Sequence, residues 1–395
     1  MGRLLPAAAV AIGVGALPAV ADPIVDRDYA IELYEGVAIG DSSLTGMGGA
    51  GAARVNGSAG TLINASAPAV RRTTDNDSWS WDYHLDYLTG RFSTDYDNNG
   101  QVAPEAEGAQ LATAGLALRF GLWSGALTFT GQDSPVDGST PPLFAKTLRG
   151  KLVIARWIPS WDLALGVGIQ SIAFQLGPQN GEPLFDLKGA GLVAGATWLP
   201  RGASYRVAVA LESRIVSSEV TPGGCDPTMC RADPDDPMST AYILPDEIES
   251  PGRTIVGIAY RWAESPWNQQ VKTKFRDELS VTVTGDLILA GSSTDGHGIE
   301  AFAMQQLQRS GAHVTVSPRA GVEVEALPGR LRLRAGSYWE PERFEGVRGR
   351  AHGTFGFELR ALEFKLWGIR RGKLGATFDI ARRYRNIGLS VGFWH

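Results

Sequence analysis

Residues 79–87 read WSWDYHLDY, and this stretch indicates the fold class. Aromatic and aliphatic side chains alternate with serine, aspartate and histidine, so the extended chain is apolar on one face and polar on the other. The same period of two recurs further along the chain, over 161–170, 279–289, 354–360 and 373–380. Alternation that persists through so much of the chain predicts an all-β protein.

The lengths of the expected strands distinguish a membrane protein from a soluble one. Most of them have nine or more residues, as tilted membrane strands need, whereas strands in soluble sheets average about 5–6 residues. Their number is even, which is the rule for single-chain bacterial barrels. We therefore predict a transmembrane antiparallel β-barrel of about 14 strands. The expected strands cover 78–88, 111–120, 123–131, 146–157, 161–174, 186–198, 203–215, 252–263, 277–290, 312–326, 329–339, 351–362, 372–381 and 386–394.

The connections between these strands alternate in length, which assigns the two ends of the barrel. If the first strand runs outward from the periplasm, the periplasmic connections are short and the outer ones long, as is usual for such barrels. Two periplasmic connections, 263–276 and 363–371, are longer than this rule expects. The short connections are 120–123, 159–160, 198–203 and 327–329, and the long ones are 89–110, 131–145, 175–185, 216–251, 291–311 and 340–350.

Tryptophan placement also favours a membrane barrel. Indole rings prefer the headgroup level of a bilayer and form girdles there. Core packing in a soluble β protein is the alternative explanation. Trp339 lies near an expected outer strand end. The tryptophans near expected periplasmic ends are Trp79, Trp123, Trp157, Trp161, Trp198, Trp262 and Trp394.

The N-terminus reads MGRLLPAAAVAIGVGALPAVADP and has the form of an export signal. Arg3 supplies a positive charge, small apolar residues follow, and Ala19-Val20-Ala21 has the small-x-small pattern of a signal-peptidase site. We predict a signal peptide over 1–21, with a retained membrane helix as the alternative. No window of 18 apolar residues follows. The mature chain is therefore expected to be periplasmic, secreted or an outer-membrane barrel.

Composition and charge exclude several other classes of protein. Of 395 residues, 49 are glycine and 44% are hydrophobic, which argues against a disordered chain and against a helix-rich enzyme. The net charge of −5, without any block of lysine and arginine, makes nucleic acid an unexpected partner. Cys225 and Cys230 are too few for a zinc site but could pair in a small disulfide. Residues 233–237 (DPDDP) fit either a calcium-binding loop or a solvated turn.

Residues 22–77 precede the first expected strand and lack sustained alternation. They are rich in small residues, as in DSSLTGMGGAGAA at 41–53 and TLINASAPAV at 61–70. A mobile leader is one interpretation. A plug inside the barrel explains the composition better, because small residues allow close approach to the wall. We therefore predict an N-terminal hatch over 22–77 and a barrel over 78–395.

Charged residues on neighbouring strands are expected to face one another inside the barrel. In GVEVEALPGRLRLRAG, at 321–336, the apolar side chains face lipid, so the charged ones between them face the lumen. A turn at 328–329 places two glutamates opposite two arginines, and the next strand extends the array. Because buried charges need partners, this charge ladder is either a brace of ion pairs or a polar pathway. Its members are Glu323, Glu325, Arg332, Arg334, Glu358 and Arg360.

The end of the chain carries the most specific signal. Apolar residues occupy alternate positions from Ile387 to Phe393, ahead of Trp394 and His395. This pattern resembles the terminal strand that the outer-membrane assembly machinery recognises, although the usual last residue is aromatic. The barrel assembly machinery is therefore an expected partner.

Several segments resemble the FadL-type outer-membrane transporters of hydrophobic compounds. GDSSLTGMGGAGAA at 40–53 and GTLINASAPAV at 60–70 are similar to the family's N-terminal hatch. ILPDEIESPGRTIVGIAYRW at 243–262, RAGSYWEPERF at 334–344 and FDIARRYRNIGLSVGFWH at 378–395 resemble later barrel segments. The resemblance implies a fourteen-stranded barrel with a plug, and Asn64 and Pro68 as candidate substrate-binding residues. The family hatch usually carries a contiguous Asn-Pro-Ala, whereas here three residues separate Asn64 from Pro68.

The resemblance implies an outer-membrane channel of a Gram-negative bacterium for passive uptake of hydrophobic molecules, of the fatty-acid or aromatic-hydrocarbon class. One alternative is a barrel scaffold in secretion or outer-membrane assembly without a small-molecule ligand. Another is a general diffusion porin, which a plug disfavours. No metal-type histidine spacing and no G-x-S-x-G elbow occur, so we expect no enzyme, cofactor or metal. His84, beside Asp82 and Asp86, is interpreted as a hydrogen-bonding group in the lumen. Outer-membrane lipid and an apolar ligand are expected partners of a monomer.

Overall fold

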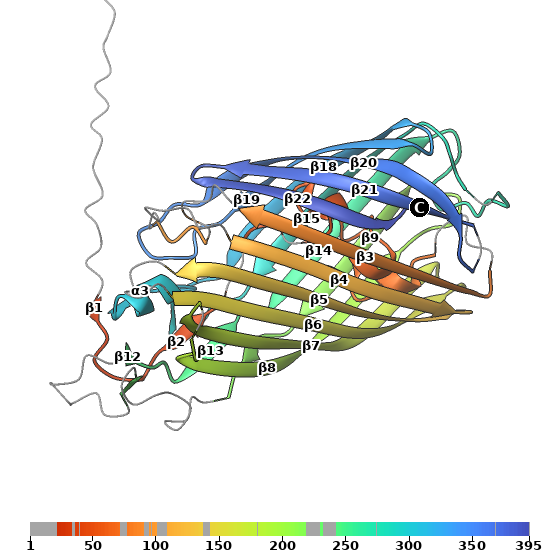
Figure 1. The fold of residues 1–395 in the computed structure, drawn as a ribbon. Helices are drawn as coiled ribbons and strands as arrows, with labels where there is room; N and C mark the ends of the chain where they lie inside the picture. The colour runs from red at the N-terminus through yellow and green to blue at the C-terminus, as the bar shows by residue number, and fades with distance from the viewer. Residues whose placement is uncertain are drawn as a thin grey trace, which may run out of the picture.

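Fourteen antiparallel strands form one closed barrel in the computed structural model (Figure 1). This confirms the predicted fold class. The structure describes residues 22–33, 36–38, 40–71, 77–90, 95, 97–100, 109–136, 143–179, 181–218, 230–231, 242–273, 275–367 and 369–394. The barrel strands are β3 (Trp79–Gly90), β4 (Ala109–Phe120), β5 (Trp123–Val136), β6 (Leu143–Ile158), β7 (Leu163–Pro178), β8 (Phe185–Trp198), β9 (Tyr205–Glu212), β14 (Arg253–Ala263), β15 (Ser280–Ala290), β18 (Thr315–Leu327), β19 (Leu331–Glu340), β20 (Arg350–Lys365), β21 (Ile369–Ala381) and β22 (Tyr384–Phe393).

Each expected strand overlaps one of these strands, and the differences lie at the strand ends. β5 runs to Val136, past the expected end at 131, because its last residues pair with the start of β6. β9 ends at Glu212, before the expected end at 215. Beyond it, β10 (Ile215–Val216) pairs with β13 (Glu247–Ser250), and Ser217 forms an isolated bridge with Gly189 of β8.

The two faces of the wall have opposite chemistry, as the period of two predicts. Outward-pointing Leu85, Leu152 and Val167 are 53%, 51% and 64% exposed. Inward-pointing residues such as Thr128 and Ala164 are almost completely buried. An apolar outer band over a polar or small-residue lumen is the arrangement of a barrel that sits in lipid.

The tryptophan girdle is confirmed for most of the expected residues. Trp79, Trp123, Trp161, Trp198 and Trp262 are exposed near one end of the barrel, and Trp339 is exposed near the other.

Two tryptophans expected in the girdle point elsewhere. Trp157 is partly buried against a small cluster that includes Ala155 and Leu199. Trp394 is 3% exposed, because the chain turns inward after the last strand and places the indole ring 4.1 Å from the guanidinium of Arg332. These two positions were wrongly assigned to the lipid-facing girdle.

The two ends of the barrel differ in their connections. We call the end that carries the C-terminus the C-terminal mouth, and the opposite end the loop end (Figure 1). Connections at the C-terminal mouth are 121–122, 159–162, 199–204, 264–279, 328–330 and 366–368. Connections at the loop end are 91–108, 137–142, 179–184, 213–252, 291–314, 341–349 and 382–383.

Residues 40–71, here called the plug, lie inside the barrel and contact its wall on several sides (Figure 1). The plug contains the short helices α1 (Ser42–Thr45), α2 (Gly57–Gly60) and η1 (Ala67–Ala69). Glycines on the wall permit its close approach. A Cβ atom at Gly336 would lie 2.3 Å from the Met47 backbone, and one at Gly166 would lie 2.0 Å from the Ala65 carbonyl oxygen. The small inward face of the strands is therefore the surface that receives the plug.

Aspartates of the wall hold the plug through its backbone. Asp286 accepts hydrogen bonds from the amides of Gly51 and Ala52 at 2.7 and 2.9 Å. In β3, Asp82 accepts from the Ser58 amide at 2.9 Å, and Asp86 does the same for Ser42 at 3.0 Å. These carboxylates satisfy backbone groups that would otherwise be buried without partners.

The chain ahead of the plug lies at the loop end. β1 (Asp22–Pro23) pairs with β17 (Gln306–Leu307), and β2 (Ala30–Glu32) pairs with both β13 and β16 (Gly296–His297). The short strands β11 (Cys230–Arg231) and β12 (Tyr242–Ile243) and helix α3 (Ile299–Ala303) lie in the same region (Figure 1).

A large apolar core fills the loop end. We call it the loop-end core. Its buried members are Ile24, Tyr29, Ile31, Val136, Leu143, Ala145, Phe174, Leu176, Leu184, Phe185, Leu187, Ile243, Leu244, Ile248, Phe302 and Ala303.

Several predictions fall on residues that the structure does not describe: the signal peptide at 1–21, Cys225, the acidic stretch at 233–237 and His395. Within the described ranges, no helix is both long and apolar enough to cross a membrane.

Candidate functional site at the C-terminal mouth

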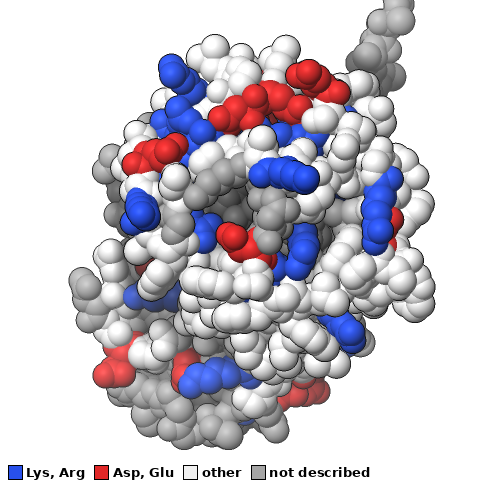
Figure 2. All heavy atoms as spheres, turned by 90° about the vertical axis from the view of Figure 1, so that its right-hand side faces the viewer, with Lys and Arg blue, Asp and Glu red and all other residues white. Residues whose placement is uncertain are grey.

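A cavity of about 270 Å³ opens at the C-terminal mouth, between the plug and the ends of the strands. Figure 2 shows this end of the molecule, hollowed near its centre and surrounded by acidic and basic side chains. Trp267, Phe275 and Arg276 line it from connection 264–279, and Trp367 lines it from connection 366–368. Connection 264–279 is long, as expected, and helps to close the mouth. The expected long connection at 363–371 was wrong, because β20 runs to Lys365 and β21 begins at Ile369.

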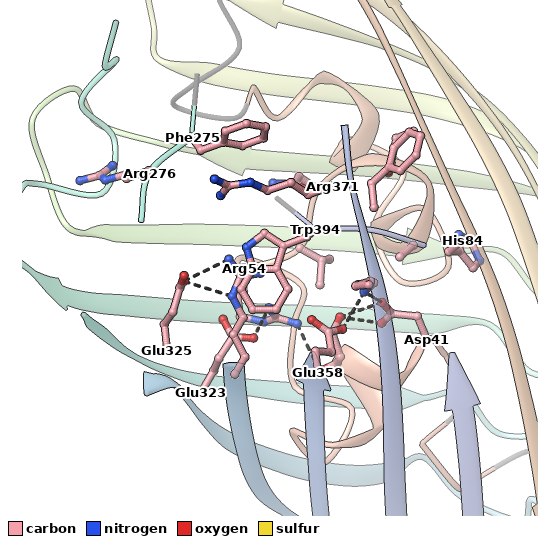
Figure 3. A pocket seen from close by; sticks show the side chains of 18 of the residues that line it. Asp41, Arg54, His84, Phe275, Arg276, Glu323, Glu325, Glu358, Arg371 and Trp394 are labelled. Carbon is pink, nitrogen blue, oxygen red and sulfur yellow. Dashed lines mark hydrogen bonds and ion pairs between the residues drawn. The ribbon is translucent and has the colours of Figure 1, made fainter. Parts of the chain in front are cut away.

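The charge ladder lines this cavity, as Figure 3 shows for several of its members. The register places Glu323 opposite Arg334 and Glu325 opposite Arg332 on β18 and β19. Nε of Arg334 donates to Glu323 at 2.6 Å, and Nη2 donates to Glu358 of β20 at 2.8 Å. Both Nε and Nη2 of Arg332 donate to Glu325 at 3.1 Å. The ladder thus consists of ion pairs across three neighbouring strands.

The plug completes the ladder with charges of its own. Nζ of Lys373, on β21, lies 2.6 Å from Glu358 and 3.6 Å from Asp41 of the plug. Arg54 of the plug lies 3.3 Å from Glu323. These contacts join the plug to the wall by charge as well as by backbone hydrogen bonds (Figure 3).

Asp41 shows how strongly this environment holds a charge. Its carboxylate caps α1 by accepting from the Leu44 amide at 2.9 Å and from the Ser43 hydroxyl at 2.7 Å. Burial opposes ionisation, but the Lys373 ammonium and the Ser43 hydrogen bond outweigh it and keep the pKa of Asp41 below its usual value. Asp41 therefore stays ionised at neutral pH and keeps its link to the wall.

Arg360 lies apart from the rest of the ladder. It is only half-buried, its register partner is Lys373, and a β-bulge follows it in β20. It does not line the cavity. The five other ladder residues all do.

The candidate substrate-binding residues Asn64 and Pro68 lie in the plug, away from this cavity. Nδ2 of Asn64 donates to the Ala52 carbonyl and to the Thr197 hydroxyl, both at 3.0 Å, and Oδ1 accepts from Ser66. The side chain is 1% exposed. Pro68 borders a second hollow of only about 20 Å³. Here Asn64 positions the plug against β8, and its contact with a ligand stays a prediction.

Arginines stack on the aromatic rings that line the mouth. Arg206 lies 3.8 Å from the Trp267 ring centre, and Arg371 lies 3.6 Å from that of Phe275. Arg276 fixes connection 264–279 by donating to the carbonyl oxygens of Ser265, Pro266 and Trp267 at 2.6 to 3.1 Å. The aromatic rings and the guanidinium groups of the cavity wall are therefore held by one another as well as by hydrogen bonds.

The histidine in the cavity does not complete a catalytic triad. Nδ1 of His84 lies 3.0 Å from Oγ of Ser58, and Asp82 contacts that same serine, at 3.2 Å. A triad needs the histidine between the serine and the acid, and Ser58 is 0% exposed. No group of three or more histidine, cysteine, aspartate or glutamate residues in the described ranges could hold a metal ion.

Sequence reasoning missed several cavity residues. Arg206, Arg261 and Lys373 stand at inward positions of alternating strands, so the period of two could have found them. Trp267 and Phe275 follow no such pattern. The only sequence signal for them was that their connection is longer than a periplasmic turn usually is.

Comparison with known proteins identifies the fold. No protein-family model matches the sequence, and no curated protein is significantly similar to it. Among solved structures, the CymD monoaromatic hydrocarbon channel matches with a TM-score of 0.53 at 11% identity, over 91% of this chain and 97% of that one. A mutant of the TodX monoaromatic hydrocarbon channel matches with a TM-score of 0.53 at 12% identity, over 92% of this chain and 100% of that one. A Pseudomonas aeruginosa FadL homologue matches with a TM-score of 0.51 at 12% identity, over 91% of this chain and 98% of that one.

The fold is that of the FadL-type channels. The match extends over nearly the whole length of both chains. The FadL-type resemblance inferred from the short hatch and strand motifs is thereby confirmed at the level of fold.

Proposed function

We propose that this protein is an outer-membrane channel of a Gram-negative bacterium, through which hydrophobic small molecules pass without an energy source. The observation that carries the proposal is the fold, a fourteen-stranded barrel that is similar to two monoaromatic hydrocarbon channels. The plug argues against a general diffusion porin, because a porin needs an open, water-filled lumen. We also propose that 22–77 act as the hatch and 78–395 as the barrel.

The loop-end core supports an apolar cargo. It joins N-terminal residues, strand ends and loop residues in one apolar region at the loop end. We propose that this end faces the outside of the cell. Phe185 lies 6.1 Å from Phe174 and 5.9 Å from Phe302, so aromatic rings form its centre. A fatty-acid chain or an aromatic hydrocarbon could exchange with such side chains at little cost in solvation.

The seam of the barrel supports a sideways exit. β22 pairs with β3 only from His84 to Thr89, although β3 begins at Trp79. Tyr83 and Phe393, which flank this seam, lie among the residues that line the cavity. An apolar molecule leaving here would pass between aromatic rings and would not have to cross open water.

A reversible lock on the plug tests the proposal. The hydroxyls of Ser42 in the plug and Ser390 in β22 are hydrogen-bonded to each other. We therefore expect the pair S42C and S390C, in a background where Cys225 and Cys230 are serine, to form a disulfide between plug and wall. Entry of labelled toluene and decanoate into proteoliposomes should fall on oxidation and recover on reduction.

The two single-cysteine variants are the matched controls, and neither should respond to oxidant. If the unlocked channel carries no probe faster than protein-free liposomes, the transport proposal is wrong and the scaffold function is favoured. If oxidation leaves a measurable uptake unchanged, the plug does not gate the route.

A further inference from the structure

Charge is unevenly distributed around the cavity at the C-terminal mouth. On the side of β18 to β21, four cationic and four acidic side chains pair with one another. They are Arg54, Arg332, Arg334 and Lys373 with Asp41, Glu323, Glu325 and Glu358. On the neighbouring strands β9 and β14 and on connection 264–279, Arg261 and Arg276 share the carboxylate of Glu278, and Arg206 lies beside them. We call these three arginines the arginine cluster. With Glu278 it carries a net charge of two positive units.

Glu278 has no capacity left for Arg206. Its Oε1 already receives the Arg261 guanidinium at 3.0 Å and Nε of Arg276 at 2.6 Å. Its Oε2 accepts from the Ser265 hydroxyl at 3.0 Å. The single carboxylate of Glu278 therefore already pairs with two guanidinium groups, and Arg206 adds a third positive charge beside them.

Arg206 is the residue that lacks an anion. It is 2% exposed, yet it lines the cavity. Its Nε donates to the Asn268 side-chain oxygen at 2.8 Å, and its face rests on Trp267. Among the residues that the structure describes, no carboxylate lies within ion-pair distance of it. The charges that act on it most strongly, those of Arg54, Arg261 and Arg276, are all positive.

Other acidic groups of the lining are already engaged or lie at the rim. Asp277 receives Arg371 at 2.6 Å, and Asp82 accepts from Ser58 of the plug. Asp77 is exposed. A buried guanidinium among like charges is costly unless an anion joins it. The terminal nitrogens of Arg206 and the cavity beside them form a place where such an anion fits.

We propose that this cavity binds a small oxyanion, a carboxylate or a phosphate, held by Arg206 and Arg261. Guanidinium groups donate in a planar fork that matches the oxygens of either group. The Trp267 and Phe275 rings give an attached apolar body a surface to lie on. The site is independent of the proposed transport of hydrophobic molecules, since it would exist in a scaffold of the same fold.

Titration calorimetry on the full-length protein in detergent tests the site. The probes are inorganic phosphate, benzoate and decanoate, with benzyl alcohol and decanol as neutral partners. At least one anion should bind more tightly than every neutral probe, and its affinity should fall as sodium chloride is added. Preference for benzoate or decanoate identifies an organic acid as the ligand, and preference for phosphate identifies an inorganic anion. Equal binding of anions and neutral probes would overturn the proposal.

Arginine variants locate the site. R206Q should weaken anion binding by about tenfold or more, as expected for a lost charge-assisted hydrogen bond, and R206K should recover part of it. The matched control is R319Q, since Arg319 also faces the lumen and stacks on a ring, Tyr338 at 5.0 Å, but does not line the cavity. Equal losses in R206Q and R319Q would contradict the assignment.

A second pair of variants keeps the test valid if R206Q does not fold. W267Q and W267E remove the same ring, but only the glutamate offers Arg206 an internal carboxylate. W267E should therefore bind the anion about tenfold or more weakly than W267Q, because the site is already filled. If the two variants bind equally, the arginine cluster does not hold the anion.

Discussion

At the loop end of the lumen, Phe174, Phe185 and Phe302 pack ring against ring, whereas at the C-terminal mouth Arg334 joins Glu323 to Glu358. Both regions are buried, and both hold part of the N-terminal segment. The loop-end core is non-directional, so its residues can shift or admit another apolar group at small cost. The charge ladder at the mouth depends on pairing, because a buried charge that loses its partner is strongly destabilising.

This difference bears on the route of a solute. In the transport that we propose, an apolar molecule would enter among the side chains of the loop-end core. The charge ladder at the mouth offers it no apolar surface, whereas the aromatic rings beside the ladder do. The aromatic seam near Tyr83 and Phe393 would therefore be its favoured exit, because the rings there offer it an apolar surface. In this proposal the charge ladder would oppose its passage through the mouth, and the arginine cluster would retain an anion there.

The largest expected effect is at the mouth. Glu358→Gln leaves Arg334 and Lys373 buried beside a neutral amide, and we expect it to lower the free energy of unfolding by about 3–5 kcal/mol. Urea unfolding in lipid vesicles measures this. The control is Glu363→Gln, whose carboxylate is exposed and pairs with Arg371 at 3.2 Å. It should cost about 1 kcal/mol or less. Similar losses in the two variants would contradict the need for complete pairing.

A comparable loss of unfolding free energy is expected when an apolar side chain is removed from the loop-end core. Phe174→Ala removes a side chain that is 1% exposed, and it should cost about 3 kcal/mol by loss of apolar burial and creation of a cavity. Unlike the loss in Glu358→Gln, it should not change with ionic strength. Phe129→Ala, on the outer face, is the matched control and should cost less in detergent. If the stability loss of Phe174→Ala depended strongly on salt, the loop-end core would not differ from the charge ladder in the way that we describe.

An intermediate loss of unfolding free energy is expected when a hydrogen bond between the wall and the plug is removed. Asp286→Ala leaves the amides of Gly51 and Ala52 without their acceptor, and we expect a loss of about 1–3 kcal/mol. Hydrogen exchange should speed up at these two amides first. Asp186→Ala, at an exposed site of β8, is the control. Unchanged exchange in Asp286→Ala would show that other contacts hold this part of the plug.

The smallest effect is a pH dependence at Asp41. Because its pKa is lower in the folded protein, it stabilises the fold above the unfolded pKa of about 3.9, and this stabilisation is lost as the pH falls through the lower folded value. Asp41→Asn keeps the helix cap but not the charge, so it should be less stable than the parent at pH 6 by about 1 kcal/mol. The difference in urea midpoint should shrink at pH 3. A difference that is constant with pH would mean that the charge of Asp41 contributes nothing.

Much of the wall was predictable from the sequence. Each of the fourteen expected ranges overlaps a barrel strand, because lipid on one side and a filled lumen on the other impose a period of two on every strand. The pairing of Glu323 with Arg334 was predictable for the same reason, since a tight turn fixes the register of a hairpin. The girdle assignments of Trp157 and Trp394 were wrong, because both continue the inward positions of their strands. Trp157 follows buried Val153 and Ala155, and Trp394 follows buried Ser390.

The contacts at the mouth could not be predicted from the sequence pattern. Alternation marks Arg206 as inward-facing, but its lack of a carboxylate depends on which side chains connection 264–279 brings beside it. That connection has no periodic pattern, so neither its path nor its contacts could be read from its residues. Likewise, Asn64 could be assigned to the hatch, whereas its hydrogen bond to Thr197 could not be foreseen.

The sequence by itself determined a strand-by-strand barrel with an apolar outside, because side-chain alternation is a local property of an extended chain. Only the tertiary structure decided which charges inside are balanced. Balance depends on contacts such as the ion pair of Arg261 with Glu278 and the hydrogen bond of Arg206 to Asn268, which form only when the barrel closes and connection 264–279 folds into its mouth.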